Sequence, residues 1–84
     1  GQELLTVSIE HKDNQAVKKA LLGLATVEKV TEIDGKGGYF RLQSKPDATS
    51  KHAVFDLCVA NKWYLNELSG IETRLEDVFR EVTN

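Results

Sequence analysis

The spacing of apolar residues changes along this chain, and that change constrains its fold more than any other feature. Residues 5–10 alternate apolar and polar, which is typical of a β-strand with one buried face. Asp13 or Asn14 can then cap a helix, and Gly23 lies where a left-handed residue often ends one. The apolar face of this helix follows the i, i+3, i+4, i+7 spacing: Val17, Ala20, Leu21 and Leu24.

Residues 34–38, Asp-Gly-Lys-Gly-Gly, form the strongest turn signal in the sequence. The preceding residues, 27–33, are rich in β-branched side chains, but their apolar positions do not alternate cleanly, so a bulge is expected. Residues 39–43 resume an extended pattern. The three segments together predict a β-hairpin.

A second helix is predicted after Pro46, which ends the hairpin because it has no N–H to donate. Asp47 or Thr49 is expected to open this helix, and residues 61–62 to close it. Its apolar stripe is expected to include the following residues: Ala53, Val54, Phe55, Leu57, Cys58 and Asn61.

The remaining sequence predicts one more strand and one more helix. Residues 63–68 read as a strand that Ser69-Gly70 breaks. Thr73 and Glu76 have the spacing of a capping box, which indicates a helix start. Four residues form the apolar face of that last helix: Leu75, Val78, Phe79 and Val82.

The predicted order is βαββαβ followed by a helix. We therefore expect an α+β, ferredoxin-like fold, in which two helices cover one face of an antiparallel sheet and the first and third strands are central. With 84 residues, the chain forms one core and one domain, 1–84.

Composition argues against several classes of function. The formal net charge of −2 and a pI of about 5.6 disfavour nucleic-acid binding. No apolar run approaches the length of a membrane span. A single cysteine indicates a reducing, cytoplasmic setting. The chain has no methionine and begins with Gly1, which favours a piece excised from a longer protein.

No pattern of catalytic, cofactor-binding or metal-ligating residues is recognised, so we expect no enzyme activity in this chain. The glycines at 35–38 lack the P-loop spacing. His11 and His52 read as surface residues, and Cys58 as a small buried one. The serines lack the strand-to-helix elbow of a nucleophile: Ser44, Ser50 and Ser69.

Residues 74–83, Arg-Leu-Glu-Asp-Val-Phe-Arg-Glu-Val-Thr, closely resemble the C-terminal ending of ATP-binding subunits of bacterial ABC-2-type exporters, of the drug-resistance and gliding-motility types. In that family a domain of this size follows the nucleotide-binding domain. The succession of a strand at 27–30, a glycine turn at 35–38 and a strand beginning with an aromatic residue at 39–42 also fits the family. The chain departs from it at Arg74, where a small residue is common, and at Arg80, where an apolar one is usual.

The resemblance implies an accessory or regulatory domain that stabilises the ATPase dimer. ATP and Mg²⁺ would bind the parent chain, upstream of Gly1, and this domain would need no cofactor. Its partners would be the nucleotide-binding domain, the dimer mate and a membrane permease, at the cytoplasmic side of the inner membrane; a homodimer is also expected from exposed strand edges. The expected contact residues lie on the last helix: Leu75, Val78, Phe79 and Arg80.

Two other functions stay open at the level of sequence. An ACT-like domain that senses a small molecule has the same topology and could use loop 11–14, although that loop has no glycine. A structural adaptor unrelated to transport is the second alternative. The last helix itself has three possible places: on its own sheet, within its own core, or on a partner.

Overall fold

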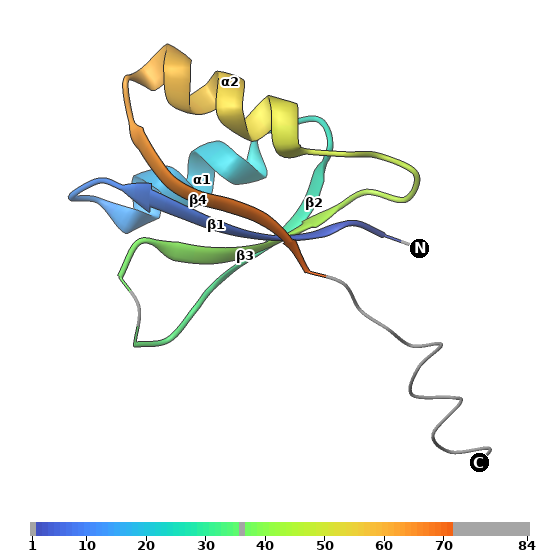
Figure 1. The fold of residues 1–84 in the computed structure, drawn as a ribbon, viewed down its shortest axis with the longest axis horizontal. Helices are drawn as coiled ribbons and strands as arrows, with labels where there is room; N and C mark the ends of the chain where they lie inside the picture. Colours follow the sequence, from blue (N-terminus) through green and yellow to red (C-terminus); the bar gives the residue numbers. More distant parts are fainter. Residues whose placement is uncertain (1, 36, 72–84) are drawn as a thin grey trace.

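The computed structural model describes residues 2–35 and 37–71, which contain six elements (Figure 1). In chain order they are β1 (Leu4–Glu10), α1 (Asn14–Leu22), β2 (Val27–Glu32), β3 (Tyr39–Ser44), α2 (Lys51–Asn61) and β4 (Tyr64–Ile71). This succession agrees with the predicted βαββαβ order. The helix predicted after residue 72 lies outside the described residues.

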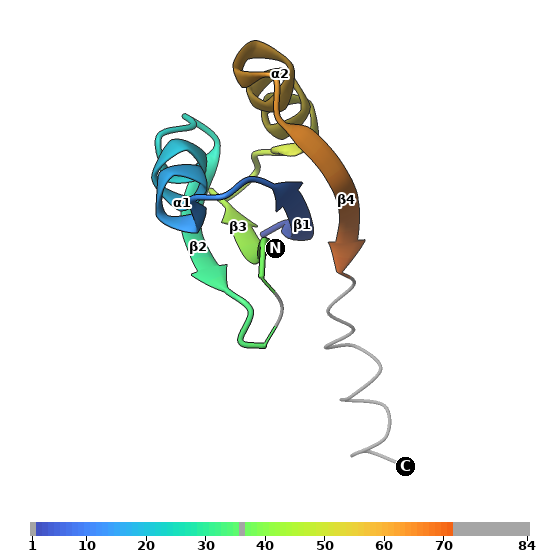
Figure 2. The same ribbon diagram turned by 90° about the vertical axis from the view of Figure 1, so that its left-hand side faces the viewer.

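The four strands form one sheet in the order β2-β3-β1-β4, and every neighbouring pair is antiparallel. The prediction that the first and third strands are central is confirmed. Figure 2 shows the helices and the sheet edge-on, with β2 and β4 at opposite ends of the strand order. The described part of the chain is therefore an α+β unit with a four-stranded antiparallel sheet and two helices.

One face of the sheet makes the hydrophobic core. On β1 every second residue is completely or almost completely buried: Leu5, Val7 and Ile9. Phe40 and Leu42 of β3 lie beside them, and the helices add four buried residues: Val17, Leu21, Val54 and Cys58. Each large apolar side chain so buried stabilises the fold by roughly 1.5–3 kcal/mol. Both helices therefore pack on the same face, and no described helix covers the other face, which is called the open face below.

α1 starts and ends where the sequence predicts, but its last turn has a different conformation from the one expected. The Asp13 carboxylate accepts hydrogen bonds from the backbone N–H groups of Gln15 and Ala16, which caps the helix. Gly23, expected to be left-handed, has φ −76° and continues in a right-handed turn. Its N–H donates to the Lys19 and Ala20 carbonyls, so the helix end is satisfied without a left-handed residue.

The hairpin between β2 and β3 is confirmed, and so is the bulge. Gly35 and Gly38 have positive φ angles of 79° and 82°, which glycine adopts without strain. The register shifts between Val27 and Lys29, where β2 gains a residue relative to β3. The glycine run is thus a turn between strands.

The start of α2 differs from the prediction. Asp47 follows Pro46 in a turn with φ 61°, which is incompatible with a helix start, and α2 begins after Ser50. The predicted close at residues 61–62 is confirmed: Lys62 has φ 57°, and Trp63 donates its N–H to the Cys58 carbonyl across the helix end.

Phe55 was expected on the buried stripe of α2 but is 57% exposed. It follows Val54 by one residue, and a step of 100° around the helix turns it away from the core.

The prediction that Ser69-Gly70 breaks the last strand is wrong. β4 continues to Ile71 because Ser69 and Gly70 pair with Thr6 and Leu5 of β1. Turn-forming residues are tolerated here because a neighbouring strand holds their backbone in register.

Candidate interaction surfaces

The residues predicted to contact a partner, Leu75, Val78, Phe79 and Arg80, lie outside the described residues. The candidate surfaces below lie on residues 2–35 and 37–71. Four features of that part carry polar or exposed side chains close together: the open face of the sheet, the tip of the β2–β3 hairpin, the end of the sheet near Glu3, and the outer side of α2.

The open face of the sheet is polar. The strand register places Thr31, Arg41, Thr6 and Ser69 in one row across all four strands. Lys29 lies beside Gln43 in the next row. Within the described residues, neither Arg41 nor Lys29 forms an ion pair. This face offers hydroxyls and two cations that are unpaired within the described residues. The strand register also places apolar side chains on it: Leu4, Tyr39, Tyr64 and Ile71.

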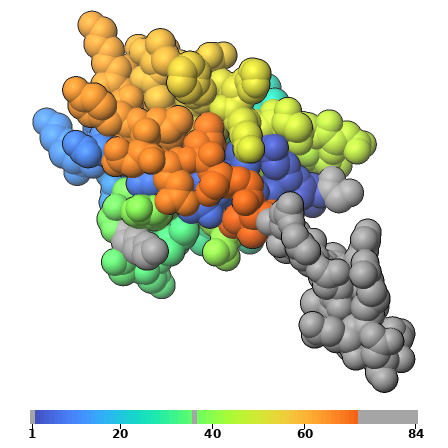
Figure 3. Space-filling model, in the orientation of Figure 1, coloured from blue at the N-terminus to red at the C-terminus, as the bar shows by residue number. Residues whose placement is uncertain are grey.

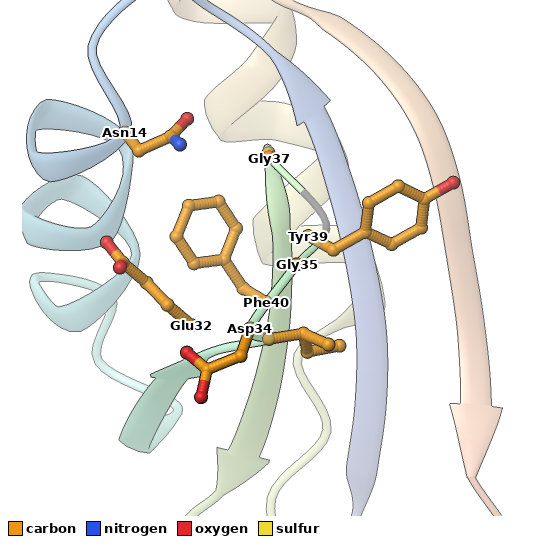
Figure 4. Close-up of a pocket in the computed structure, with 9 residues that line it drawn as sticks. Asn14, Glu32, Asp34, Gly35, Gly37, Tyr39 and Phe40 are labelled. Carbon is orange, nitrogen blue, oxygen red and sulfur yellow. The ribbon is translucent and has the colours of Figure 1, made fainter.

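A hollow of about 240 Å³ lies between the hairpin tip and the start of α1 (Figure 4). Figure 4 shows Phe40 turned toward α1 and Tyr39 turned to the other side of β3. Apart from Asn14 of α1, all of its lining residues belong to the hairpin, and three of them are glycines: Glu32, Ile33, Asp34, Gly35, Gly37, Gly38, Tyr39 and Phe40. Gln15 already donates to the Glu32 carboxylate at 3.3 Å. Among the described residues, no group of three or more His, Cys, Asp or Glu side chains could hold a metal ion.

A second hollow, of about 360 Å³, lies between the hairpin and loop 11–14. Gly38 brings the two together: its carbonyl accepts the Ile9 N–H at 2.9 Å. Glu10 and Lys12 line this hollow together with Gly37 and Tyr39. A glycine-bearing loop therefore does lie beside loop 11–14, although it comes from a distant part of the sequence.

Three hydroxyls and one carboxylate form a partly buried cluster at the end of the sheet. Ser44 donates its hydroxyl proton to Glu3 Oε1 at 2.9 Å, and Ser50 N–H donates to the same oxygen at 2.7 Å. The Ser50 and Ser44 hydroxyl oxygens are 2.6 Å apart, and Thr26 Oγ1 is 2.9 Å from Ser50 Oγ. Since Ser44 gives its proton to Glu3, Ser50 donates to Ser44, and Thr26 donates to Ser50.

Every group of this cluster has a partner, and Ser44 and Ser50 have no exposed surface. Glu3 thereby holds the N–H group at the start of α2, in the manner of a helix cap supplied from another strand. We interpret the cluster as structural. Sequence reasoning missed it because Glu3 is 41 and 47 residues away from its two partners.

The remaining reactive residue types are placed mostly as the sequence predicted. Cys58 is 2% exposed, and burial raises the pKa of its thiol. His52 is exposed on α2. His11 is half-buried: its Nδ1 lies 3.0 Å from Asp13 N, and its ring centre lies 5.2 Å from that of Trp63. His11 therefore helps to shape the turn between β1 and α1.

Comparisons with models of protein families, with curated proteins and with solved structures gave no match. Among the described residues, no helix has both the length and the apolar character needed to cross a bilayer. The functional assignment therefore rests on the sequence and on the surfaces described above.

Proposed function

We propose that this chain is the non-catalytic C-terminal accessory domain of an ABC-2-type exporter ATPase, with a ferredoxin-like fold. The parent chain would bind ATP and Mg²⁺ and couple hydrolysis to export at the cytoplasmic side of the membrane. This domain would stabilise or regulate the ATPase dimer and contact the permease. The observation that carries the proposal is the sequence of residues 74–83, which follows directly after a βαββαβ unit.

The strand order supports the fold part of the proposal. In a ferredoxin-like sheet, two βαβ crossovers leave the first and third strands in the centre, and the order β2-β3-β1-β4 has them there. Both helices also pack on one face. These features are compatible with a small domain appended to a larger enzyme, but they do not by themselves point to transport.

The polar row across the open face favours a partner chain, and not this sheet, as the docking surface of the last helix. A helix with Leu75, Val78 and Phe79 on one side needs an apolar surface to bury them, since each costs roughly 1.5–3 kcal/mol if left in water. The row through Arg41 offers hydroxyls and charge instead. We infer that the apolar side of this helix docks on the nucleotide-binding domain or on the dimer mate.

The coding sequence upstream of Gly1 tests the assignment directly. We expect a Walker A motif, an ABC signature and a Walker B acidic residue there. A start codon at Gly1, or a metabolic enzyme upstream, would contradict the exporter assignment.

The contact role is tested in the full-length parent. Phe79→Ala is expected to weaken ATPase dimerisation at least about tenfold, which corresponds to about 1.4 kcal/mol. Glu81→Ala is the matched control, because two residues along a helix place it about 200° away from Phe79. Equal effects of the two substitutions would exclude a contact made by the apolar side.

The hollow between loop 11–14 and the hairpin favours a second candidate, an ACT-like sensor of a small molecule. Its volume of about 360 Å³ suits an amino acid, and it is lined by both a carboxylate and an ammonium group, Glu10 and Lys12. An amino acid that raises the melting temperature of the wild-type chain but not of Lys12→Ala would support this candidate. No shift with any of the common amino acids would exclude it.

A further inference from the structure

The two edges of the sheet differ in how well they are protected against pairing with another strand. Three of the six residues of β2 are charged, and a bulge interrupts its pairing with β3. β4 has eight residues and one charge, Glu67, and within the described part of the chain it pairs only with β1. Charges and bulges are the usual devices that keep an edge strand from pairing with another chain. β4 has a bulge at Asn66, but five regular residues, 67–71, follow it.

Exposed apolar side chains lie beside the less protected edge. Phe55 and Val59 are one turn apart on α2 and are 57% and 63% exposed. Tyr64, at the start of β4, is 73% exposed, but it pairs with Glu10 and therefore lies on the open face of the sheet, away from α2. In Figure 3, α2 and β4 lie side by side on the surface of the molecule. The edge of β4, which no other described strand covers, and the apolar side of α2 thus form one continuous surface.

The charges on this surface indicate what covers it. A hollow of about 440 Å³ is lined by Leu68 of β4 and by four residues of α2: Lys51, His52, Phe55 and Asp56. Lys51 and Asp56 have opposite charges, and within the described residues neither forms an ion pair. A two-fold axis makes residue i of one copy face residue j of the other, and j face i. An axis near Leu68 would therefore bring each Lys51 toward the Asp56 of the second copy.

We propose that β4 and the outer side of α2 form an isologous interface with a second copy of this chain. The two β4 strands pair antiparallel through residues 67–71, so the two sheets become one. The two α2 helices then run antiparallel across the axis, with Phe55 of each copy against the other helix and two Lys51–Asp56 ion pairs around them. With the axis at Ser69, Glu67 faces Ile71 of the second copy, so the two Glu67 side chains do not face each other. This inference does not depend on the exporter assignment.

Sedimentation equilibrium of the 84-residue chain tests the proposal. We expect the chain to dimerise with a dissociation constant below about 1 mM. Lys51→Glu should raise the dissociation constant at least about tenfold, and so should Asp56→Lys, because each brings like charges together. The double variant Lys51→Glu/Asp56→Lys should restore it. Both positions are exposed, so these variants should keep the fold.

Lys29→Glu is the matched control, since it makes the same charge change at the β2 edge and should leave the dissociation constant unchanged. Amide exchange gives a second readout: protection of residues 67–71 should rise with protein concentration, whereas protection of β2 should not. A chain that stays monomeric overturns the proposal. It is also overturned if the double variant is as weak as the single ones, or if only a chain cut after Ile71 dimerises, because residues 72–84 would then cover this surface.

Discussion

Gly38 lies at the closest approach between the hairpin and β1, and two independent conditions require glycine there. Its φ is 82°, and a Cβ atom at this position would be 2.8 Å from the Ile9 carbonyl oxygen. The first condition costs an L-residue about 1–2 kcal/mol, and the second forces the two backbones apart. We therefore predict that Gly38→Ala lowers the free energy of unfolding by more than about 2 kcal/mol in urea denaturation.

The neighbouring glycines separate these two conditions. Gly35 has φ 79° with open space around it, so Gly35→Ala should cost only the strain of about 1–2 kcal/mol. Gly37 has open space and no positive φ, so Gly37→Ala should change stability by less than about 0.5 kcal/mol. Equal losses in the free energy of unfolding for Gly35→Ala and Gly38→Ala would show that the close approach to Ile9 does not affect stability.

The buried thiol of Cys58 makes stability depend on pH in alkaline solution. Burial raises its pKa above the ordinary value of 9.0, so the folded chain holds this proton more tightly than the unfolded chain does. Below 9.0 both states keep the proton. As the pH rises above that value the unfolded chain ionises first, and the free energy of unfolding falls until the folded thiol also ionises.

We predict that wild-type stability falls more steeply than that of Cys58→Ala between about pH 8 and about pH 10, because only the wild type has this thiol. Urea denaturation at both pH values measures the difference, since the two proteins differ only at Cys58. Parallel losses in the two proteins would mean that Cys58 ionises equally in both states.

At the scale of the elements, α2 ends at a lysine whose backbone conformation would be less strained in glycine. Lys62 has φ 57° and ψ 40°, the left-handed conformation in which glycine is favoured. Its side chain is exposed and bonds to none of the described residues. We predict that Lys62→Gly raises the free energy of unfolding by roughly 0.5–1 kcal/mol, after the added freedom of the unfolded chain is subtracted.

Ala60→Gly is the control for this substitution. Ala60 is exposed and helical, two residues earlier, so glycine there should lower stability by about 1 kcal/mol. Thermal unfolding of both variants gives the comparison. A decrease in both would contradict the left-handed cap.

The element boundaries show what the sequence could predict and what it could not. Strand alternation on β1 and the capping residue Asp13 are local signals, and both predictions were confirmed. The start of α2 depends on Glu3, and the extension of β4 through Gly70 depends on Leu5. Those contacts join distant parts of the chain, so no local pattern could indicate them.

The same limit applied to the candidate surfaces. The hollow beside loop 11–14 needs glycines from the hairpin, and the hollow on α2 needs Leu68 from β4. The residue types were visible in the sequence, but only the strand register brings them together. Phe55 is the instructive case: helical spacing placed it near the stripe, and the structure turns it outward.

At the scale of the whole molecule, the described elements bury a core of their own. Apolar residues without any exposed surface come from both helices and from the two central strands: Leu5, Val7, Val17, Leu21, Leu42 and Val54. β4, which ends at Ile71, adds Leu65 and Leu68 around that core. All of these side chains precede residue 72.

We therefore predict that a chain cut after Ile71 folds and unfolds cooperatively, with a melting temperature within about 5 °C of the 84-residue chain. Leu42→Ala in the 84-residue chain is the control for a damaged core and should lower the free energy of unfolding by about 2–5 kcal/mol. Far-UV circular dichroism on heating measures all three proteins. If the shortened chain has no cooperative transition, Leu75, Val78 and Phe79 are needed for this domain's own core and cannot be reserved for a partner. If it melts like the full chain, the last helix contributes little to the fold, and its apolar side is free to bind the ATPase.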